Sequence, residues 1–200
     1  MKMDPQVQKF TAKGQATRQR IIDGAAAEIR THGAVATTLD DVLARTATSK
    51  SQLFHYFPHG KDQLLLAVAE QEAARVLSDQ QPHLSALTSW AAWHRWRDVV
   101  IERYRKQGQQ CPLSTVVSEL GRTPGAQAVT ATLIGQWRAE LEAGVRAMQD
   151  QGKVAPSVDP HRAAAALLAG IQGGVSVLLN TGDIGYLEAA LDVGIANLRG

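Results

Sequence analysis

Residues 37–64 read TTLDDVLARTATSKSQLFHYFPHGKDQL, and this stretch decides the fold of the first part of the chain. Thr38 stands where the N-cap of one helix belongs, and Ser49 stands at the same place before a second, short helix that runs to about Phe57. After the break at Pro-His-Gly, another helix begins near Lys61. Two helices joined by a short turn are typical of a helix-turn-helix, whose second helix enters the major groove of DNA. The stretch therefore predicts a DNA-reading unit.

The second helix of this unit has an apolar and a polar side. We expect the apolar side to pack on the preceding helices, and it carries Leu53, Phe54 and Phe57. The polar side faces outward and carries Lys50, Ser51, Gln52 and His55. A lysine can read the O6 and N7 atoms of guanine, and a glutamine can pair with adenine through two hydrogen bonds. The residues predicted to bind DNA from helix ends or from the edge of the interface are Thr38, Ser49, Tyr56 and Lys61. By spacing alone, a helical hairpin with a solvated polar side explains the same pattern.

The rest of the chain has helical periodicity, and no segment alternates as a strand would. We predict an all-α protein of about nine helices, with a flexible tail at 1–14, a three-helix DNA-binding domain at 15–60 and a larger helical domain at 61–200. The expected helices cover roughly 15–31, 38–46, 49–57, 61–79, 84–106, 113–120, 125–151, 160–180 and 184–198.

Charge is distributed unevenly along the chain. The net charge of all 200 residues is only +2, so the protein as a whole is not a polycation. Residues 1–60 hold eight Lys and Arg against five Asp and Glu, whereas the remainder holds thirteen against fourteen. A modest basic excess therefore coincides with the predicted DNA-reading unit, as expected for a segment that faces phosphates.

The segment from Ala16 to Leu66 resembles the N-terminal domain of the TetR family of transcriptional regulators. The residues that carry the resemblance are Thr17, Arg18, Ile21, Ile22, Ala25, Ala26, Gly33, Thr37, Thr38, Leu39, Val42, Ser49, Leu53, Phe54, Tyr56, Phe57, Lys61 and Leu64. The pattern Leu-Phe-x-Tyr-Phe followed by a lysine is its most specific part. The resemblance implies an all-α homodimer in which the N-terminal helices bind operator DNA and the C-terminal helices bind a ligand and dimerise.

Two features depart from the common pattern of that family. The turn reads Thr46-Ala47-Thr48 where the family usually has Ala-Gly-Val, so Ala47 must adopt backbone angles that glycine favours, at a cost of roughly 1 kcal/mol if φ is positive. This turn leaves open a helical small-molecule receptor or interaction protein that has lost sequence-specific DNA binding. The loop Pro58–Lys61 carries one residue more than the commoner form, and together with CPLS at 111–114 it looks like the LmrA/YxaF-like branch.

Tryptophans gather in the second half of the chain. Trp90, Trp93 and Trp96 recur every three residues on one predicted helix, and Trp137 lies on another. Core packing explains any single one of them. Large aromatic side chains with a few polar groups also line apolar ligand pockets, and in the TetR family the pocket lies among these middle helices. We therefore predict a site for a small apolar or aromatic effector, to which five residues contribute: Trp93, Trp96, Cys111, Trp137 and Gln172.

The last two predicted helices are rich in small residues, and Gly170 and Gly174 stand four positions apart. Small residues let helices approach closely, and the apolar remainder of these helices is too extensive for a solvated face. Two such helices from each of two subunits form a four-helix interface in a two-fold dimer. The predicted interface residues are Leu167, Gly170, Ile171, Gly174, Leu178, Leu191 and Ile195. The alternative is packing within one subunit.

Chemistry other than binding has little support in the sequence. Cys111 is the only cysteine, the six histidines lack metal-ligand spacing, and no phosphate-binding glycine loop or nucleophile motif occurs. We therefore expect no cofactor, no metal and no enzymatic activity. The first residues lack the apolar segment of a signal peptide, and the longest apolar run, Ala163–Leu179, falls short of the ~20 residues that span a bilayer. A cytoplasmic protein without membrane contact is the expectation.

Together these features predict a ligand-responsive transcriptional regulator, more specifically a repressor. It would bind a palindromic operator as a homodimer and be released by a small apolar or aromatic effector. Its partners would be double-stranded operator DNA, the effector and a second copy of the chain. A dimer would hold its two recognition helices about one DNA turn apart, roughly 34 Å.

Overall fold

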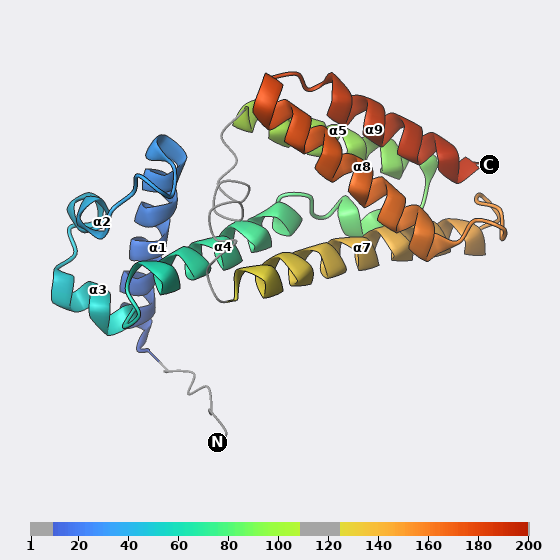
Figure 1. Ribbon diagram of the computed structural model, residues 1–200. Helices are drawn as coiled ribbons and strands as arrows, with labels where there is room; N and C mark the ends of the chain where they lie inside the picture. Colours follow the sequence, from blue (N-terminus) through green and yellow to red (C-terminus); the bar gives the residue numbers. More distant parts are fainter. Residues whose placement is uncertain (1–9, 109–124, 200) are drawn as a thin grey trace.

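The computed structural model describes residues 10–108 and 125–199, and within these ranges the chain is helical, without any strand (Figure 1). Its eight α-helices are α1 (Ala12–His32), α2 (Leu39–Thr46), α3 (Lys50–Tyr56), α4 (Lys61–Ser78), α5 (Trp90–Gln107), α7 (Ala126–Asp150), α8 (Pro160–Thr181) and α9 (Gly185–Ala196). Two 3₁₀-helices, η1 (Leu84–Ala86) and η2 (Asn197–Arg199), complete the described elements. The predicted all-α class is confirmed, and the helix expected over 113–120 lies outside the described residues.

The first three helices form a unit at one end of the molecule, with α2 and α3 on its outer side (Figure 1). α1 packs against α2 and α4. It begins at Ala12, because the side chain of Thr11 accepts a hydrogen bond from the backbone N–H of Gly14 and so caps the helix. The prediction of a flexible tail reaching residue 14 was therefore wrong for residues 12–14, which form the first turn of α1.

α4 contributes to two separate hydrophobic cores. The reader core joins its first half, including Leu64 and Val68, to the apolar sides of α1, α2 and α3. The body core takes Ala73 and Val76 from its second half and joins them to α5, α7, α8 and α9. In Figure 1, α4 accordingly runs from the N-terminal unit to the larger helical body and lies beside α7. One helix thus connects the two parts of the molecule through packed side chains at both of its ends.

The predicted single helix over 84–106 is two elements. η1 forms one short turn, and α5 then starts at Trp90, because the side chain of Ser89 accepts a hydrogen bond from the N–H of Ala92. Ser89 has an extended backbone, which is the usual conformation of an N-cap residue. The sequence signal for this break was a serine followed by an apolar helical stretch, and the prediction missed it.

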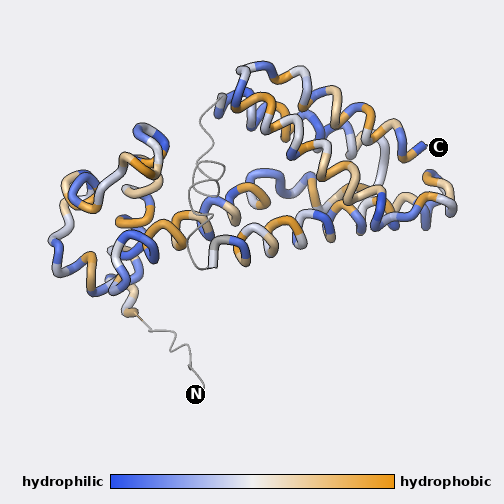
Figure 2. The backbone as a smooth tube through the Cα atoms, viewed as in Figure 1, coloured by the Kyte–Doolittle hydropathy of each residue, from blue (hydrophilic) through white to orange (hydrophobic). Residues whose placement is uncertain are grey.

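α8 and α9 form a close helical hairpin over the body, with α8 packed between α7 and α9 (Figure 1). A Cβ added at Gly174 would lie 2.5 Å from the Cα of Leu187, and one at Gly194 would lie 2.2 Å from Cδ1 of Leu167. These glycines therefore serve the packing of α8 on α9 within one subunit. α8 is long and apolar enough to cross a membrane by length and composition, but its inner side belongs to the body core. Figure 2 shows hydrophobic and hydrophilic residues alternating along the helices, as amphipathic packing requires.

Candidate nucleic-acid interface

The turn between α2 and α3 is built from Thr46, Ala47 and Thr48. Ala47 has φ 46° and ψ 45°, and it is the only non-glycine residue with positive φ in the described part of the chain. Both threonines are buried, and their hydroxyls satisfy each other: Thr46 Oγ1 lies 2.9 Å from Thr48 Oγ1 and donates to the carbonyl of Val42 at 2.7 Å. A glycine is therefore not needed here, because the flanking hydroxyls hold the left-handed residue in place.

Thr38 and Ser49 are the N-caps of α2 and α3, as predicted, and each forms a capping box with the residue three positions later. Thr38 Oγ1 accepts from the N–H of Asp41 at 3.2 Å, and the N–H of Thr38 donates to Asp41 Oδ2 at 2.9 Å. The hydroxyl of Thr38 also donates to Asp41 Oδ2 at 2.6 Å, and this hydrogen bond, followed by the one from the Thr38 N–H, lowers the pKa of Asp41. In the same way Ser49 Oγ accepts from the N–H of Gln52 at 3.2 Å, and the N–H of Ser49 donates to Gln52 Oε1 at 3.2 Å. The amide oxygen of Gln52 thus also stabilises the start of α3.

α3 presents its polar side outward. Its exposed residues include the four that were predicted on this side, namely Lys50, Ser51, Gln52 and His55. Leu53 and Phe57 are buried in the reader core, and the guanidinium of Arg18 lies 5.2 Å from the centre of the Phe57 ring. Phe54 was predicted to face inward, but 39% of it is exposed. In a helix of only seven residues the apolar side is too narrow to hold all three apolar side chains, so Phe54 lies on the outer surface beside Lys50 and Leu39.

The remaining predicted contacts lie around α3. Tyr56 is half-buried, and its ring packs against those of His55 and Phe10. Lys61 is half-buried in the first turn of α4, and its Nζ donates to the carbonyl of Val35 at 3.3 Å. The structure therefore brings all eight predicted DNA-binding residues to one end of the molecule. Sequence reasoning missed Phe10, since a lone aromatic residue before the first helix carries no periodic signal.

A buried carboxylate ties α1 to α2 behind this surface. Glu28 on α1 pairs with Arg45 on α2, and its other oxygen lies 2.9 Å from Nδ1 of His32. The hydrogen bond from Arg45 lowers the pKa of Glu28, although burial acts in the opposite direction. The pair holds α2 at a fixed angle to α1, which in turn sets the position of the turn and of α3.

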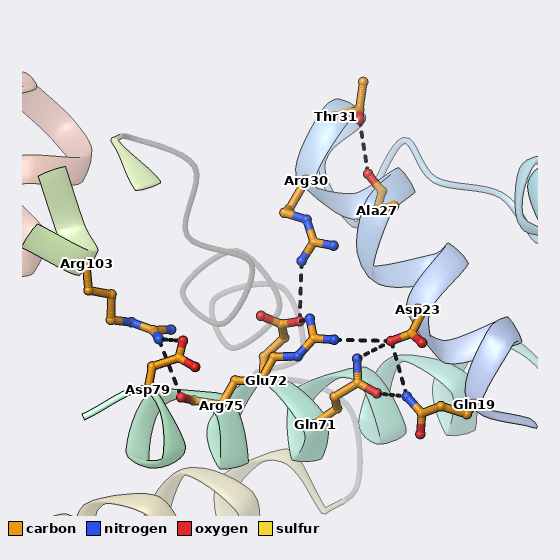
Figure 3. A network of polar contacts seen from close by, with 10 residues as sticks. All are labelled: Gln19, Asp23, Ala27, Arg30, Thr31, Gln71, Glu72, Arg75, Asp79 and Arg103. Carbon is orange, nitrogen blue, oxygen red and sulfur yellow. Dashed lines mark hydrogen bonds and ion pairs between the residues drawn. The ribbon is translucent and has the colours of Figure 1, made fainter. Parts of the chain in front are cut away.

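A second polar network joins α1, α4 and α5 (Figure 3). Glu72 on α4 is buried and accepts from Arg75 at 2.9 Å and from Arg30 on α1 at 3.3 Å. Arg75 also donates to Asp23 on α1 at 3.2 Å. Arg103 on α5 pairs with the carboxylate of Asp79 and donates to the backbone carbonyl of Arg75 at 3.4 Å. The network borders a cleft of about 730 Å³, and it connects the N-terminal unit to the body through α4.

The predicted effector residues separate into two groups. Trp93, Trp96 and Trp137 are fully buried in the body core, and the Trp93 and Trp96 rings meet edge to face at 5.8 Å. Nε1 of Trp96 donates to Oε1 of the buried Gln80 at 2.8 Å. Nε1 of Trp93 and Nε1 of Trp137 are buried without a hydrogen-bond partner in the described part of the chain.

Gln172 does not lie with these tryptophans. It is exposed on α8, whose neighbouring Ile171 and Val175 are buried, so helical periodicity turns Gln172 away from the body core. The predicted contribution of Gln172 to a site shared with the tryptophans is therefore not supported by its position. Cys111 lies outside the described residues.

The predicted dimer residues are mostly inside the subunit. Six are buried by packing within the chain, namely Leu167, Ile171, Gly174, Leu178, Leu191 and Ile195, and Gly170 is half-buried. The small residues of α8 and α9 let these two helices bury one another's apolar sides, and the assignment of these residues to a surface between subunits stays a prediction. The surface of the hairpin is different: Val193 is 59% exposed and lies with Ala166 and Gly170 along a groove of about 650 Å³.

Within residues 10–108 and 125–199, no group of three or more His, Cys, Asp or Glu side chains could hold a metal ion. The charged residues of the N-terminal unit (α1–α3) and of the network that joins α1, α4 and α5 are instead paired with one another or exposed. The arrangement offers an outward polar helix, a formed turn and ordered helix starts, which are the parts needed to contact a DNA duplex.

Two family models match the chain. The model described as bacterial regulatory proteins, tetR family, matches residues 21–68, and the model described as tetracyclin repressor-like, C-terminal domain, matches residues 86–193. An HTH-type transcriptional regulator of Mycobacterium tuberculosis is 30% identical over 116 residues, which make up 54% of this chain and 55% of that protein. The chain thus matches about half the length of this curated relative.

Solved structures share the fold over nearly the whole chain. A TetR-family transcriptional regulator from Cytophaga hutchinsonii has a TM-score of 0.77 at 18% identity, with 95% of this chain and 98% of that one covered. SmeT, the repressor of the Stenotrophomonas maltophilia multidrug efflux pump SmeDEF, has a TM-score of 0.69 at 22% identity, with 92% and 91% covered. A complex of SmeT with triclosan aligns to the same extent.

Proposed function

Because the chain belongs to the TetR family of transcriptional regulators, we propose that it is a ligand-responsive repressor that binds a palindromic operator as a homodimer. Members of this family are DNA-binding regulators and not enzymes, and they are typically repressors that respond to small molecules. The exposed polar side of α3, behind a fully formed turn, is the observation that carries the proposal.

The rival function is a helical receptor or interaction protein that no longer reads DNA. Its support in the sequence was the Thr46-Ala47-Thr48 turn, which lacks the usual glycine. The hydrogen bonds of the two threonine hydroxyls remove that support, because they stabilise the conformation that a glycine would otherwise provide. An intact turn favours the DNA-binding function over the rival.

We propose specific roles for the residues around α3. Lys50 and Gln52 lie on the exposed side and have the chemistry to read base edges, with Ser51 and His55 beside them. Thr38, Ser49, Tyr56 and Lys61 lie at helix ends or at the edge, where phosphate contacts fix the position of the protein on the duplex. The hydrogen bond from the Ser49 N–H to Gln52 Oε1 supports the proposed base-reading role of Gln52, because it holds the amide group of this side chain in a defined place.

The second copy would dock on the outer side of the α8–α9 hairpin. A groove of about 650 Å³ with the exposed Val193, Ala166 and Gly170 gives that side an apolar, closely approachable surface. This revises the predicted interface residues and keeps the predicted helices. A two-fold pair would hold its α3 helices about one turn of B-form DNA apart, roughly 34 Å.

The effector would bind in the body near Trp93, Trp96 and Trp137. The unpaired indole N–H groups of Trp93 and Trp137 are consistent with a small aromatic molecule that carries an oxygen acceptor. The SmeT–triclosan complex offers a precedent for an aromatic phenol in a protein of the same fold. The extended Pro58–Lys61 loop and the sequence of residues 111–114 support the proposal that the chain is of the LmrA/YxaF-like branch. The polar first residues support a cytoplasmic location as part of the proposal.

α4 would transmit the effector signal to α3. Its second half lies in the body core, and its first half lies in the reader core. Glu72 and Arg75 connect it to α1, and Asp79 connects it to Arg103 of α5 (Figure 3). A change in the body that moves α4 would therefore also move α1. The helices α2 and α3, which pack with α1 in the reader core, would move with it. A coupling of about 1–3 kcal/mol between effector and DNA would give a useful response.

The function is tested by selecting bound sequences from a random pool of double-stranded DNA with the full-length protein, followed by gel shifts at rising salt. We expect enrichment of an inverted repeat, binding of two chains per site, and an affinity that falls steeply with salt. A folded protein that enriches no sequence would establish the rival function. Addition of triclosan, with tryptophan fluorescence as a second measurement, then tests the effector class.

A further inference from the structure

A residue outside the helix-turn-helix contacts the end of the recognition helix. Phe10 precedes α1, and its ring centre lies 5.0 Å from that of Tyr56 and 5.9 Å from that of His55, at interplanar angles of 61° and 66°. The His55 and Tyr56 rings meet at 4.9 Å and 75°. All three contacts are edge to face, which is an arrangement that aromatic pairs prefer. Phe10 is therefore the third member of a ring cluster on the last turn of α3.

The backbone next to Phe10 is fixed by local hydrogen bonds. The side chain of Thr11 caps α1 through the N–H of Gly14 at 3.2 Å, and Nε2 of Gln15 donates to the carbonyl of Phe10 at 3.4 Å. Gly14 faces the cluster: a Cβ there would make a tight approach of 3.2 Å to Cβ of Phe10 and an ordinary contact of 3.5 Å with the hydroxyl of Tyr56. The start of α1 is thus shaped to hold the phenyl ring against α3.

The helix that receives this contact needs external support. α3 has seven residues, and isolated helices of that length are unstable in water. Its first turn is held by the capping box of Ser49 and Gln52, and its middle by the burial of Leu53. The ring of the exposed His55 contacts Tyr56 on its own helix and Phe10 outside it, and the contact with Phe10 further restricts the orientation of this ring.

We propose that Phe10 is a positioning residue for DNA recognition. Its ring holds the imidazole of His55 and the phenol of Tyr56 in the orientation in which they meet the duplex, so that Phe10 affects sequence preference without touching a base. This inference rests on the proposed DNA-binding function. It assigns to Phe10, two residues before α1, a part in specificity that the helix-turn-helix motif does not contain.

Three variants test the inference: Phe10→Ala, Phe10→Leu and Phe10→Tyr. The affinity for the sequence selected by the wild-type protein is divided by that for a scrambled sequence, and the ring proton signals of His55 and Tyr56 are recorded by NMR in the free protein. Phe10→Ala should lower the affinity ratio about tenfold and shift the ring signals. Phe10→Tyr should keep both the affinity ratio and the ring signals close to those of the wild type. Phe10→Leu, which keeps apolar bulk without an aromatic ring, should behave like Phe10→Ala.

An affinity ratio of Phe10→Ala equal to that of the wild type would overturn the inference. An equal loss of affinity for both sequences with a lower melting temperature would also overturn it, since Phe10 would then only support packing. If the wild-type protein enriched no sequence, the proposed function would be wrong, and the NMR signals would still decide the point. Unchanged His55 and Tyr56 signals in Phe10→Ala would then show that Phe10 does not order them.

Discussion

Gly24 on α1 faces Thr46 on α2 at such short range that a Cβ added to Gly24 would lie 2.1 Å from Cγ2 of Thr46. A glycine inside a helix costs about 1 kcal/mol relative to alanine, so its presence here reflects the close crossing of the two helices. Thr46 is also the last residue of α2, and its hydroxyl builds the turn to α3. The contact of Gly24 with Thr46 therefore links the crossing of α1 and α2 to the placement of the recognition helix.

Gly24→Ala should lower the free energy of unfolding by about 1–3 kcal/mol, because the new methyl group forces α1 and α2 apart. Thr46→Ser removes Cγ2 and keeps the hydroxyl, so the double variant should recover most of the loss. Gly135→Ala on α7, where a Cβ would meet nothing within 4 Å, is the matched control and should not destabilise the protein. Urea denaturation measures the wild type, Gly24→Ala, Thr46→Ser, the double variant and Gly135→Ala. If the effects of Gly24→Ala and Thr46→Ser on the free energy of unfolding were additive, the contact between these two residues would be contradicted.

Glu28 should make the stability of the protein sensitive to acid. Because the hydrogen bond from Arg45 lowers its pKa below the ordinary 4.5, its ionised form stabilises the folded state above about pH 4.5, and this contribution is lost as the pH falls through the lowered value. Glu28→Gln should therefore be less stable than the wild type at pH 7, and the difference should shrink as the solution is acidified below pH 4.5. A difference that stayed constant from pH 7 to pH 3 would rule out this role.

Glu72→Gln should destabilise the protein by about 1–3 kcal/mol, because it leaves Arg30 and Arg75 facing a neutral group at a buried position. Glu70→Gln, an exposed neighbour on α4, should stay within about 0.5 kcal/mol of the wild type. If the network also connects the body to the reader, Glu72→Gln should reduce the effect of a bound effector on operator affinity, and Glu70→Gln should not. Equal stabilities of the two variants would show that the Glu72 ion pairs contribute nothing measurable.

Gln52→Glu separates the two roles of Gln52. A glutamate can still accept from the N–H of Ser49, so the start of α3 and the melting temperature should be preserved. Gln52→Glu loses the amide donors and adds a negative charge, so it should weaken DNA binding. The loss of affinity should be largest for DNA that carries the base read by Gln52, and smaller for DNA with another base at that position. Lys61→Ala should instead weaken binding to all sequences alike and reduce the salt dependence. Gel shifts with single-base variants of the selected DNA measure the affinities of Gln52→Glu and Lys61→Ala. If both proteins lost affinity by the same pattern across these DNA variants, the assigned roles would be contradicted.

Val193→Asp should convert the proposed dimer into a monomer, since it places a charge on the exposed apolar surface of the α8–α9 hairpin. The matched control is Val35→Asp, which changes another exposed valine, in the loop after α1, and should leave association unchanged. Sedimentation velocity at micromolar concentration distinguishes the two species. A Val193→Asp protein that remained dimeric would place the interface on another surface.

The sequence predicted those elements whose signal is local. Thr38 and Ser49 each stand before an apolar helical pattern, so both could be predicted as N-cap residues. Phe54 could not be placed, because helical periodicity alone does not say how wide the buried side of a seven-residue helix is. The same limit affected α8 and α9: apolar and small residues predict a close helix partner, but they do not tell whether the partner belongs to the same chain.

Contacts between distant segments were the least accessible to sequence reasoning. The approach of Phe10 to Tyr56 depends on how the start of α1 lies against α3, and the pairing of Glu72 with Arg30 depends on how α1 and α4 cross. No local pattern reports either arrangement. The turn at Ala47 is an intermediate case. The sequence showed that a glycine was missing, and only the packing of Thr46 and Thr48 explained how the turn forms without one.

Because the first half of α4 belongs to the reader core, anyone who grafts this DNA-binding unit onto another regulatory body should cut inside a helix. A chimaera joined at residue 60 would lose Leu64 and Val68, and with them part of the apolar surface against which α1 packs. A junction near residue 70 would keep them, but the host must then continue the helix in register and supply an acid in place of Glu72. The boundary between the two modules is therefore a shared piece of secondary structure and not a linker.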